Sequence, residues 1–315
     1  MKTHIAKTAV QFDNYRTPSF FYKSAREGMQ DCLDQILTSP SAGVLLPAFI
    51  GWSPREGSGV FDPIRALGVR PGFYTLNPDL TVDMYSLEKA LEGNSFEVLV
   101  VIHYYGRTEP QISAIHALAK KHGTLLIEDL AHGFYSAAVG GVAGRYGAVN
   151  MFSLHKMFPA QDGGMITYRN ADLIKDQRET ASELAHLVLE YDWLGIAQAR
   201  RSNFVEITNR LLELPECGST FDLLWPNLET YDVPQTLPVR INTGNRDAIY
   251  QFMNGEGYGM VSLYHTLIDD VHENFPEMVA LSKSIINFPV HQDVKMSSLD
   301  GLVQSFKTVL RLEPA

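Results

Sequence analysis

The chain has 315 residues, of which 45% are hydrophobic and 20% are charged, as in ordinary globular enzymes. Its formal net charge of -10 argues against non-specific binding to nucleic acid or to an anionic membrane, although a local basic pocket remains possible. Only two cysteines occur, Cys32 and Cys217, so neither a disulfide framework nor a cysteine zinc site is expected. The histidines have no metal-ligand spacing, and no metal is expected either.

The N-terminus lacks the apolar core of a signal peptide. The chain also has no run of about 18 apolar residues, the length that a membrane-spanning helix needs. We therefore expect a cytoplasmic protein with no membrane partner.

Helical and strand patterns alternate between about residues 24 and 168. The pattern predicts helices over 25–38, 60–67, 86–91 and 111–122, and strands over 43–47, 72–76, 98–103, 125–128, 149–153 and 165–168. The run 98–103 is continuously apolar, as expected for a strand that is buried on both faces. This alternation predicts an α/β fold with a mostly parallel sheet flanked by helices.

The second half of the chain has a different pattern. Residues 171–214 look mainly helical, and residues 215–240 are irregular and contain four prolines. We place a domain boundary there, between a large domain of residues 1–214 and a small α+β domain of residues 215–315. The small domain is expected to contain strands over 237–241 and 260–264 and helices over 245–254 and 298–310.

Two charged residues follow neighbouring apolar strands. Lys156 comes three residues after the predicted strand 149–153, and Asp129 closes a strand that begins with the apolar run 125–127. Alone, the lysine could be a surface charge and the aspartate a helix cap. Together with Ser153, however, they supply what pyridoxal 5′-phosphate (PLP) needs: an amine for a Schiff base, a carboxylate for the pyridinium nitrogen and a donor for the phosphate. The sequence therefore favours a PLP site.

Two residues close to Asp129 in sequence, Glu128 and His132, are also candidates for a role in the site. Glu128 competes with it, but the alternation of side chains along a strand sends Glu128 to the opposite face. His132 follows three residues later, where it could stack on the cofactor or hydrogen-bond to its ring oxygen, or could simply be solvated.

The N-terminus of the first long helix is a second candidate for the phosphate. Ser24 and Glu27 form a capping box, which explains these residues without any ligand. The same turn also offers the backbone N–H groups of Ala25 and Arg26 and a positive helix dipole, which suit an anion.

Phe49 and Trp52 follow the strand 43–47, where an aromatic ring could stack on the flat cofactor or pack in the core. No glycine-rich dinucleotide fingerprint and no P-loop occurs in the chain.

The order of several motifs resembles the DegT/DnrJ/StrS family of PLP-dependent sugar aminotransferases over about residues 17 to 310. The segments that carry the resemblance are Val44–Phe49, Ile102–Arg107, Glu128–His132, Ser153–Lys156 followed by Asp162–Gly164, Arg201–Phe204 and Phe288–Asp293. Each motif is weak alone, and their order and spacing make the match specific.

The resemblance implies PLP fold type I and transfer of an amino group to a nucleotide-linked keto sugar, usually from glutamate. It also implies a homodimer with shared active sites, in which Asn203 reaches the cofactor phosphate of the neighbouring subunit. The chain departs from the family at Ala25, where a glycine is usual, and in a shorter region between about residues 170 and 240.

Two alternatives remain open from the sequence. One is a PLP-dependent dehydratase or epimerase on a similar sugar; Lys156 disfavours the dehydratase branch, which carries histidine there. The other is a catalytically silent regulatory relative, which Ala25 and the shortened middle region favour and the intact lysine, aspartate and serine set opposes.

Overall fold

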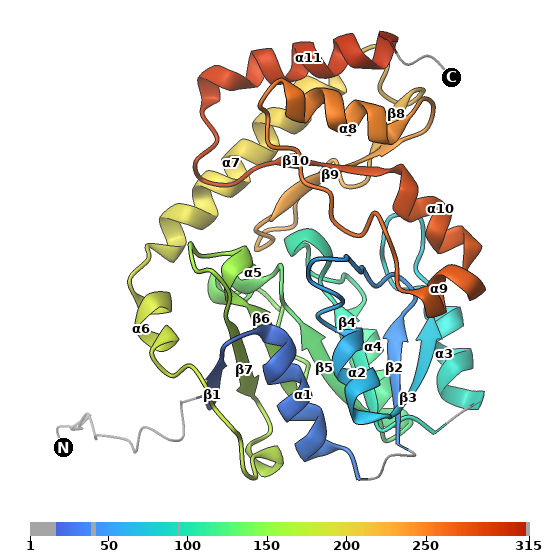
Figure 1. Ribbon diagram of the computed structural model, residues 1–315, viewed down its shortest axis with the longest axis vertical. Coiled ribbons are helices and arrows are strands. Elements are labelled where there is room, and N and C mark those ends of the chain that lie inside the picture. Colours follow the sequence, from blue (N-terminus) through green and yellow to red (C-terminus); the bar gives the residue numbers. More distant parts are fainter. Residues whose placement is uncertain (1–16, 39–41, 94, 313–315) are drawn as a thin grey trace, which may run out of the picture.

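The computed structural model describes residues 17–38, 42–93 and 95–312. Within these ranges the chain forms a large seven-stranded sheet with its helices and a smaller three-stranded sheet above it (Figure 1). No helix of the described residues is long and apolar enough to cross a membrane.

The large sheet has the strand order β1-β7-β6-β5-β4-β2-β3. Its strands are β1 (Ser19–Tyr22), β2 (Gly43–Pro47), β3 (Arg70–Tyr74), β4 (Val98–Ile102), β5 (Leu125–Asp129), β6 (Val149–Ser153) and β7 (Gly164–Tyr168). The pairings among β2, β3, β4, β5 and β6 are parallel, whereas β7 runs antiparallel to both β6 and β1. The predicted α/β class with a mostly parallel sheet is confirmed.

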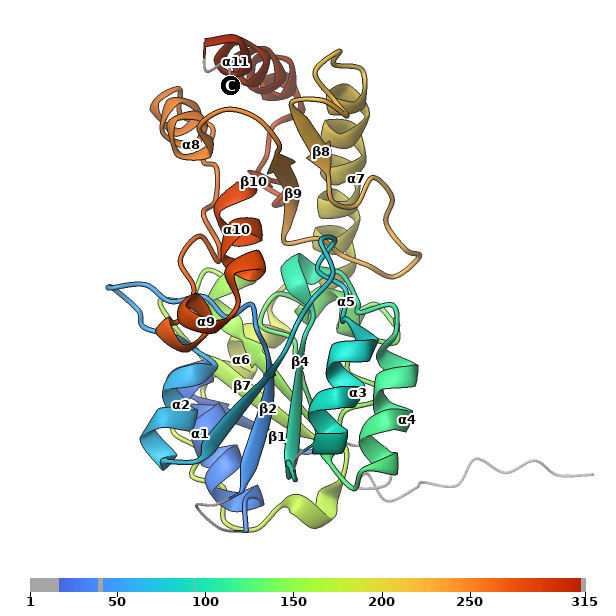
Figure 2. The ribbon, with the colours of Figure 1, turned by 90° about the vertical axis from the view of Figure 1, so that its right-hand side faces the viewer.

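Helices cover both faces of this sheet (Figure 2). On one face α1 (Ala25–Ile36) packs on β6, β7 and α2 (Phe61–Leu67). On the other, α3 (Met84–Gly93) packs on β3 and α4 (Ile112–Lys121) packs on β5. Because both faces are covered, β2 and β4 are apolar along their whole length, and all five residues of β4 are buried.

The small sheet has the order β10-β9-β8, with β8 (Phe221–Leu223), β9 (Thr236–Ile241) and β10 (Ile285–Pro289) all antiparallel. It packs with α8 (Arg246–Gly255), α11 (Leu299–Leu312) and the C-terminal half of the long helix α7 (Trp193–Leu212). The core beneath it therefore includes Phe204, Ile207 and Leu211 of α7.

The chain passes several times between the core of the large sheet and the core of the small sheet. Residues of α9 (Asp269–Asn274) and α10 (Pro276–Ser284) return to the core of the large sheet, where Val271 and Leu281 are buried. The division of domains at residue 214 thus stays a prediction, because both cores draw on residues from either side of it.

The prediction differs from the structure mainly in the second half. The region 171–214 is mainly helical, as expected, and contains α6 (Leu184–Leu189), α7 and a short turn over Ala171–Leu173. The strand expected over 260–264 is wrong: only an isolated bridge joins Val261 to Asn287. Elements not predicted are β1, α5 (Phe134–Ala138), β8, α9, α10 and β10.

Candidate active site

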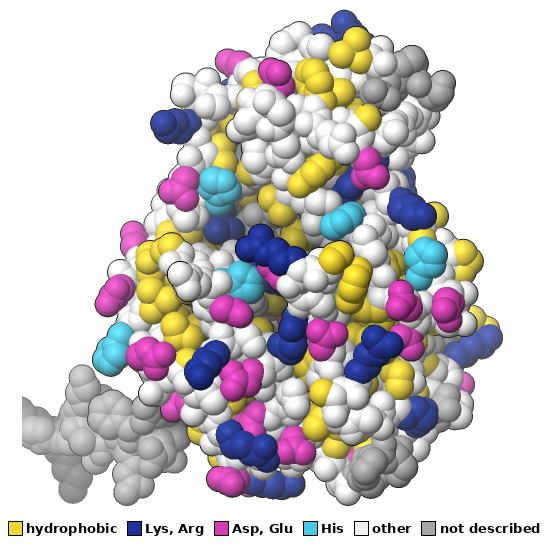
Figure 3. Space-filling view, in the orientation of Figure 1, with side chains coloured by type: hydrophobic (Ala, Val, Ile, Leu, Met, Phe, Trp, Pro, Cys, Tyr) yellow, Lys and Arg dark blue, Asp and Glu magenta, His cyan; other side chains and the backbone are white. Residues whose placement is uncertain are grey.

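The side chains of Lys156 and Asp129 meet at one edge of the large sheet. Asp129 is the last residue of β5, which runs parallel to β6, and Lys156 ends a short 3-10 turn that follows β6. The carboxyl ends of parallel strands form the crevice where ligands bind in open α/β sheets. Figure 3 shows histidine and basic side chains around the junction between the two parts of the molecule.

Lys156 is half-buried. Burial lowers the pKa of its ammonium group, although the negative charges of Asp129 and Glu56 oppose the shift. A lower pKa increases the fraction of neutral amine, the form that attacks a carbonyl carbon.

Asp129 is 2% exposed, and its Oδ1 accepts the backbone N–H of Ala131 at 2.8 Å. Burial raises its pKa, while the Ala131 N–H and the charge of Lys156 oppose the shift. Such a carboxylate would be stabilised by a cationic group placed beside it.

Glu128 faces the other way and has a structural role. Its carboxylate contacts His103 Nε2 at 2.8 Å and accepts the N–H groups of Gly144 at 2.7 Å and Tyr146 at 2.8 Å. Burial raises the pKa of Glu128, but the His103 contact and the N–H groups of Gly147 and Gly144 lower it by more, so the net shift is downward. The carboxylate of Glu128 is therefore fully engaged away from Lys156.

His132 contacts Lys156 directly, with 3.1 Å between Nε2 and the lysine Nζ. Its Nδ1 accepts the backbone N–H of Tyr105 at 3.2 Å, and the residue is only 1% exposed. Burial lowers the pKa of His132 well below its usual range, and the charge of Lys156 adds to this. The histidine is therefore a neutral member of the site and is not solvated.

The two phosphate candidates lie next to each other. Ser153 pairs with Gly164 in the β6–β7 ladder, and a Cβ added at Gly164 would lie 2.5 Å from the backbone of Ser24 and Ala25. The N-terminus of α1 therefore rests directly on β7, beside the strand that leads to Lys156. Its first-turn N–H groups, including those of Ala25 and Arg26, have no intrahelical acceptors.

The side chains around this turn are already engaged. Ser24 caps α1 by accepting the N–H of Glu27 at 3.2 Å, as predicted, while the Glu27 carboxylate accepts the N–H of Lys23. The Arg26 guanidinium contacts the Glu56 carbonyl and lies 3.4 Å from Asp62. Ser153 Oγ lies 3.3 Å from His155 Nδ1.

The two candidate aromatic residues have different environments. Phe49 is fully buried and packs edge-to-face on Tyr104, with 5.6 Å between ring centroids. Trp52 is 41% exposed. Which of them stacks on a cofactor stays a prediction.

Two tyrosines at the site were given no role in the sequence interpretation. Tyr105 lies within the motif after β4, and Tyr264 comes from the segment that joins α8 to α9. The Tyr264 ring packs 5.4 Å from Phe49 and 5.7 Å from His132. No periodicity or motif marks Tyr264, because it reaches the site only through the folding of the C-terminal part onto the large sheet.

Asn203 is not beside Lys156 within this chain. It lies on α7, is 5% exposed, and its Nδ2 donates to the carbonyls of Val290 at 3.3 Å and His291 at 2.8 Å. These bonds tie α7 to the segment after β10. A contact from Asn203 to the phosphate of a neighbouring subunit stays a prediction and requires this amide to be released.

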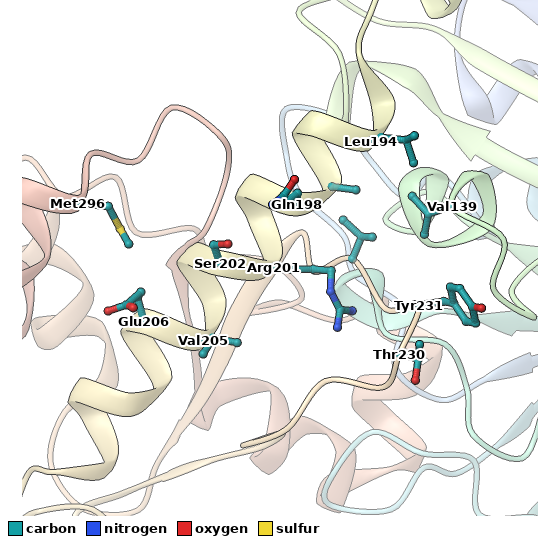
Figure 4. A pocket seen from close by; sticks show the side chains of 12 residues that line it. Val139, Leu194, Gln198, Arg201, Ser202, Val205, Glu206, Thr230, Tyr231 and Met296 are labelled. Atoms are coloured by element: carbon teal, nitrogen blue, oxygen red, sulfur yellow. The ribbon is translucent and has the colours of Figure 1, made fainter.

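An open groove of about 660 Å³ lies beside the first half of α7 (Figure 4). Leu194, Val205 and Tyr231 line it and are 70%, 47% and 50% exposed. Arg201 crosses the groove and donates to the carbonyls of Glu229 and Asp232.

The fold is that of PLP-dependent aminotransferases of fold type I. The crystal structure of NtdA from Bacillus subtilis with bound cofactor PMP matches with a TM-score of 0.75 at 16% identity, covering 94% of this chain and 74% of that one. Residues 58–188 match the model of the DegT/DnrJ/EryC1/StrS aminotransferase family, which confirms the family resemblance.

Curated relatives match over shorter stretches. L-glutamine:scyllo-inosose aminotransferase of Streptomyces griseus is 27% identical over 173 residues, 52% of this chain and 36% of that protein. UDP-N-acetyl-3-dehydro-alpha-D-glucosamine 3-aminotransferase of Acidithiobacillus ferrooxidans is 24% identical over 176 residues, 55% and 46% of the two chains. In each case the match spans less than half of the relative.

Proposed function

We propose that this protein is a PLP-dependent aminotransferase that transfers an amino group to a keto sugar. The observation that carries the proposal is the contact set around Lys156: a half-buried amine, beside the neutral His132 and the buried carboxylate of Asp129, at the carboxyl edge of the sheet. The NtdA structure with PMP and the aminotransferase relatives support the same conclusion.

The residues present fit the cofactor. Lys156 would hold it covalently and move a proton at the substrate carbon, because an amine of lowered pKa can both release and accept a proton near neutral pH. Asp129 would keep the pyridine nitrogen protonated, and the first-turn N–H groups of α1 with Ser153 would hold the phosphate. The cofactor, when bound, supplies the electron sink.

The substrate is proposed more finely as a nucleotide-linked keto sugar, with glutamate as amino donor. The UDP-sugar in the name of the Acidithiobacillus relative supports a nucleotide-linked substrate. The Streptomyces relative is instead named for L-glutamine and scyllo-inosose, so the amino donor needs a direct test. Incubation of the PLP-loaded protein with either amino acid separates the donors: glutamate should be converted to 2-oxoglutarate, and a protein that accepts only glutamine would refute the choice.

A homodimer with shared active sites belongs to the same proposal. The apolar groove beside α7, with its exposed Leu194, Val205 and Tyr231, is a surface that a second copy could cover. Asn203 lies on the same helix.

Borohydride reduction tests the covalent assignment. We expect peptide mapping of the reduced, PLP-loaded protein to place one pyridoxyl group on Lys156 and none on the variant Lys156→Ala. A label on a different lysine would show that the attachment site is wrong. A protein that binds no PLP at all would leave the silent regulatory relative as the better interpretation.

A further inference from the structure

Two strained residues pack on the same histidine. Among the described residues only Leu80, Tyr105 and Tyr264 combine a side chain with positive φ, and the last two have φ of 54° and 56°. The ring of Tyr105 is parallel to His132, with 6.0 Å between centroids and 2° between planes, and the Tyr264 ring meets His132 edge-on. Bulky residues avoid this backbone region, so its repeated use around one side chain indicates a functional constraint.

The backbone of Tyr105 is fixed from both sides. Its carbonyl accepts the N–H of Gln235 at 2.7 Å, while its own N–H donates to His132 Nδ1 at 3.2 Å. The next residue, Gly106, has φ of 88°, and a Cβ there would lie 2.3 Å from the Val233 carbonyl. The segment 233–235 therefore holds Tyr105 in the conformation that directs its N–H at the histidine.

This hydrogen bond determines the tautomer of His132. A ring nitrogen that accepts an N–H carries no proton, so the proton of a neutral imidazole must be on Nε2. Nε2 lies 3.1 Å from Lys156 Nζ. When Nε2 carries the proton and donates it, Nζ must accept with a lone pair, which only the unprotonated amine has. The opposite tautomer would instead accept from the ammonium group and favour it.

We propose that Tyr105 is a positioning residue: its backbone N–H fixes His132 in the Nε2–H tautomer, which donates to Lys156 Nζ and keeps that amine unprotonated. The other groups that face the lysine are Asp129 of β5 and Glu56 of the loop after β2, and both favour the ammonium form. His155 and Tyr264 also face His132. The proposal deepens the proposed function, because an unprotonated lysine is the form ready to take up a carbonyl cofactor.

Three substitutions at Tyr105 separate its backbone from its side chain. Tyr105→Gly keeps the N–H and adopts positive φ freely, and Tyr105→Phe removes only the hydroxyl. Tyr105→Val introduces a β-branched residue, which disfavours positive φ and should turn the N–H away from His132.

The experiment uses the cofactor-free protein, so it does not depend on catalysis. Nitrogen-15 NMR of the histidine rings, assigned with His132→Gln, reports the tautomer. Trace acetylation with mass spectrometry, with the exposed Lys120 as internal reference, reports the free amine of Lys156. We expect Nε2–H in the wild type, Tyr105→Gly and Tyr105→Phe. Tyr105→Val should mix the tautomers and slow Lys156 acetylation about tenfold at pH 8, the effect of one pKa unit.

Two results would overturn the proposal. One is an Nδ1–H tautomer in the wild type, which decides the matter even if Tyr105→Val does not fold. The other is a folded Tyr105→Val protein, checked by circular dichroism, with wild-type tautomer and acetylation. A protein that shows the expected tautomer but takes no pyridoxyl label would retain the role of Tyr105 and lose the proposed function.

Discussion

At the scale of single residues, neighbouring carboxylates in β5 have opposite roles. Asp129 faces Lys156, whereas Glu128 binds His103 and the backbone of residues 144–147. We expect Asp129→Asn to fold nearly as the wild type, because the amide is isosteric, but to lower turnover at least about 100-fold, since an amide cannot hold a proton on the pyridine nitrogen. Steady-state kinetics with matched PLP loading measure this. A near-normal rate would show that another acid has the role.

His132 gives a pH-dependent contribution to stability. Its folded pKa lies well below 6.5, so below pH 6.5 the unfolded chain binds a proton that the native protein does not, and stability falls as the pH falls. Between pH 7.5 and 5.5 this costs about 1.4 kcal/mol. Between the same two pH values, we expect the His132→Gln variant to lose about 1.4 kcal/mol less stability than the wild type. Urea unfolding at both pH values tests this, and an unchanged pH dependence would mean that His132 has the same pKa in the native and the unfolded protein.

The residues of the site were predictable to different degrees. Lys156, Asp129 and His132 were identifiable because polar residues after apolar strands must gather at the carboxyl edge of a parallel sheet. Tyr105 was visible within a motif, but its role depends on a backbone dihedral angle that residue type does not predict. Tyr264 could not be identified, because its contacts with Phe49 and His132 join segments more than 130 positions apart in sequence.

At the scale of elements, the close contact between α1 and β7 places the phosphate candidates. Gly164→Ala would put a methyl group 2.5 Å from the backbone N and Cα of Ala25, which cannot rotate away. We expect a loss of about 1–3 kcal/mol of stability and weaker PLP binding, because the N-terminus of α1 must move. Urea unfolding and a PLP titration measure the two effects.

The matched control is Gly255→Ala at the end of α8, where an added Cβ meets nothing within 4 Å. That variant should retain both stability and PLP affinity. If Gly164→Ala behaves in the same way, the helix N-terminus does not hold the phosphate.

The sequence pattern predicted strands best where every residue of the strand is buried. The strands of the large sheet other than β1 were predicted. Among them, β2 and β4 are buried along their whole length and read as short apolar runs between turns. The small sheet was harder: β8 has only three residues, and β10 follows α10 directly, with no turn residues between them to mark where the strand begins. Such strands are stabilised by pairing with neighbouring strands, so the local sequence pattern predicts them poorly.

At the scale of the whole molecule, the open question is whether two copies share their sites. The groove beside α7 exposes apolar side chains, and Asn203 on the same helix is bound to the carbonyls of Val290 and His291 in its own chain. Two roles for Asn203 can therefore be separated: an internal tie between α7 and the segment after β10, or a donor to the partner's phosphate.

Mixed dimers distinguish these roles. If the sites are shared, a Lys156→Ala subunit paired with an Asn203→Ala subunit has one site with both residues intact and one with neither. We expect activity to recover toward half that of the wild-type dimer, although each parent is weak. Mass measurement of the hybrids gives their abundance. If hybrids form and activity stays at the level of the parents, Asn203 acts only within its own chain. Asn203→Ala should then lower the unfolding temperature, because the carbonyls of Val290 and His291 lose their donor.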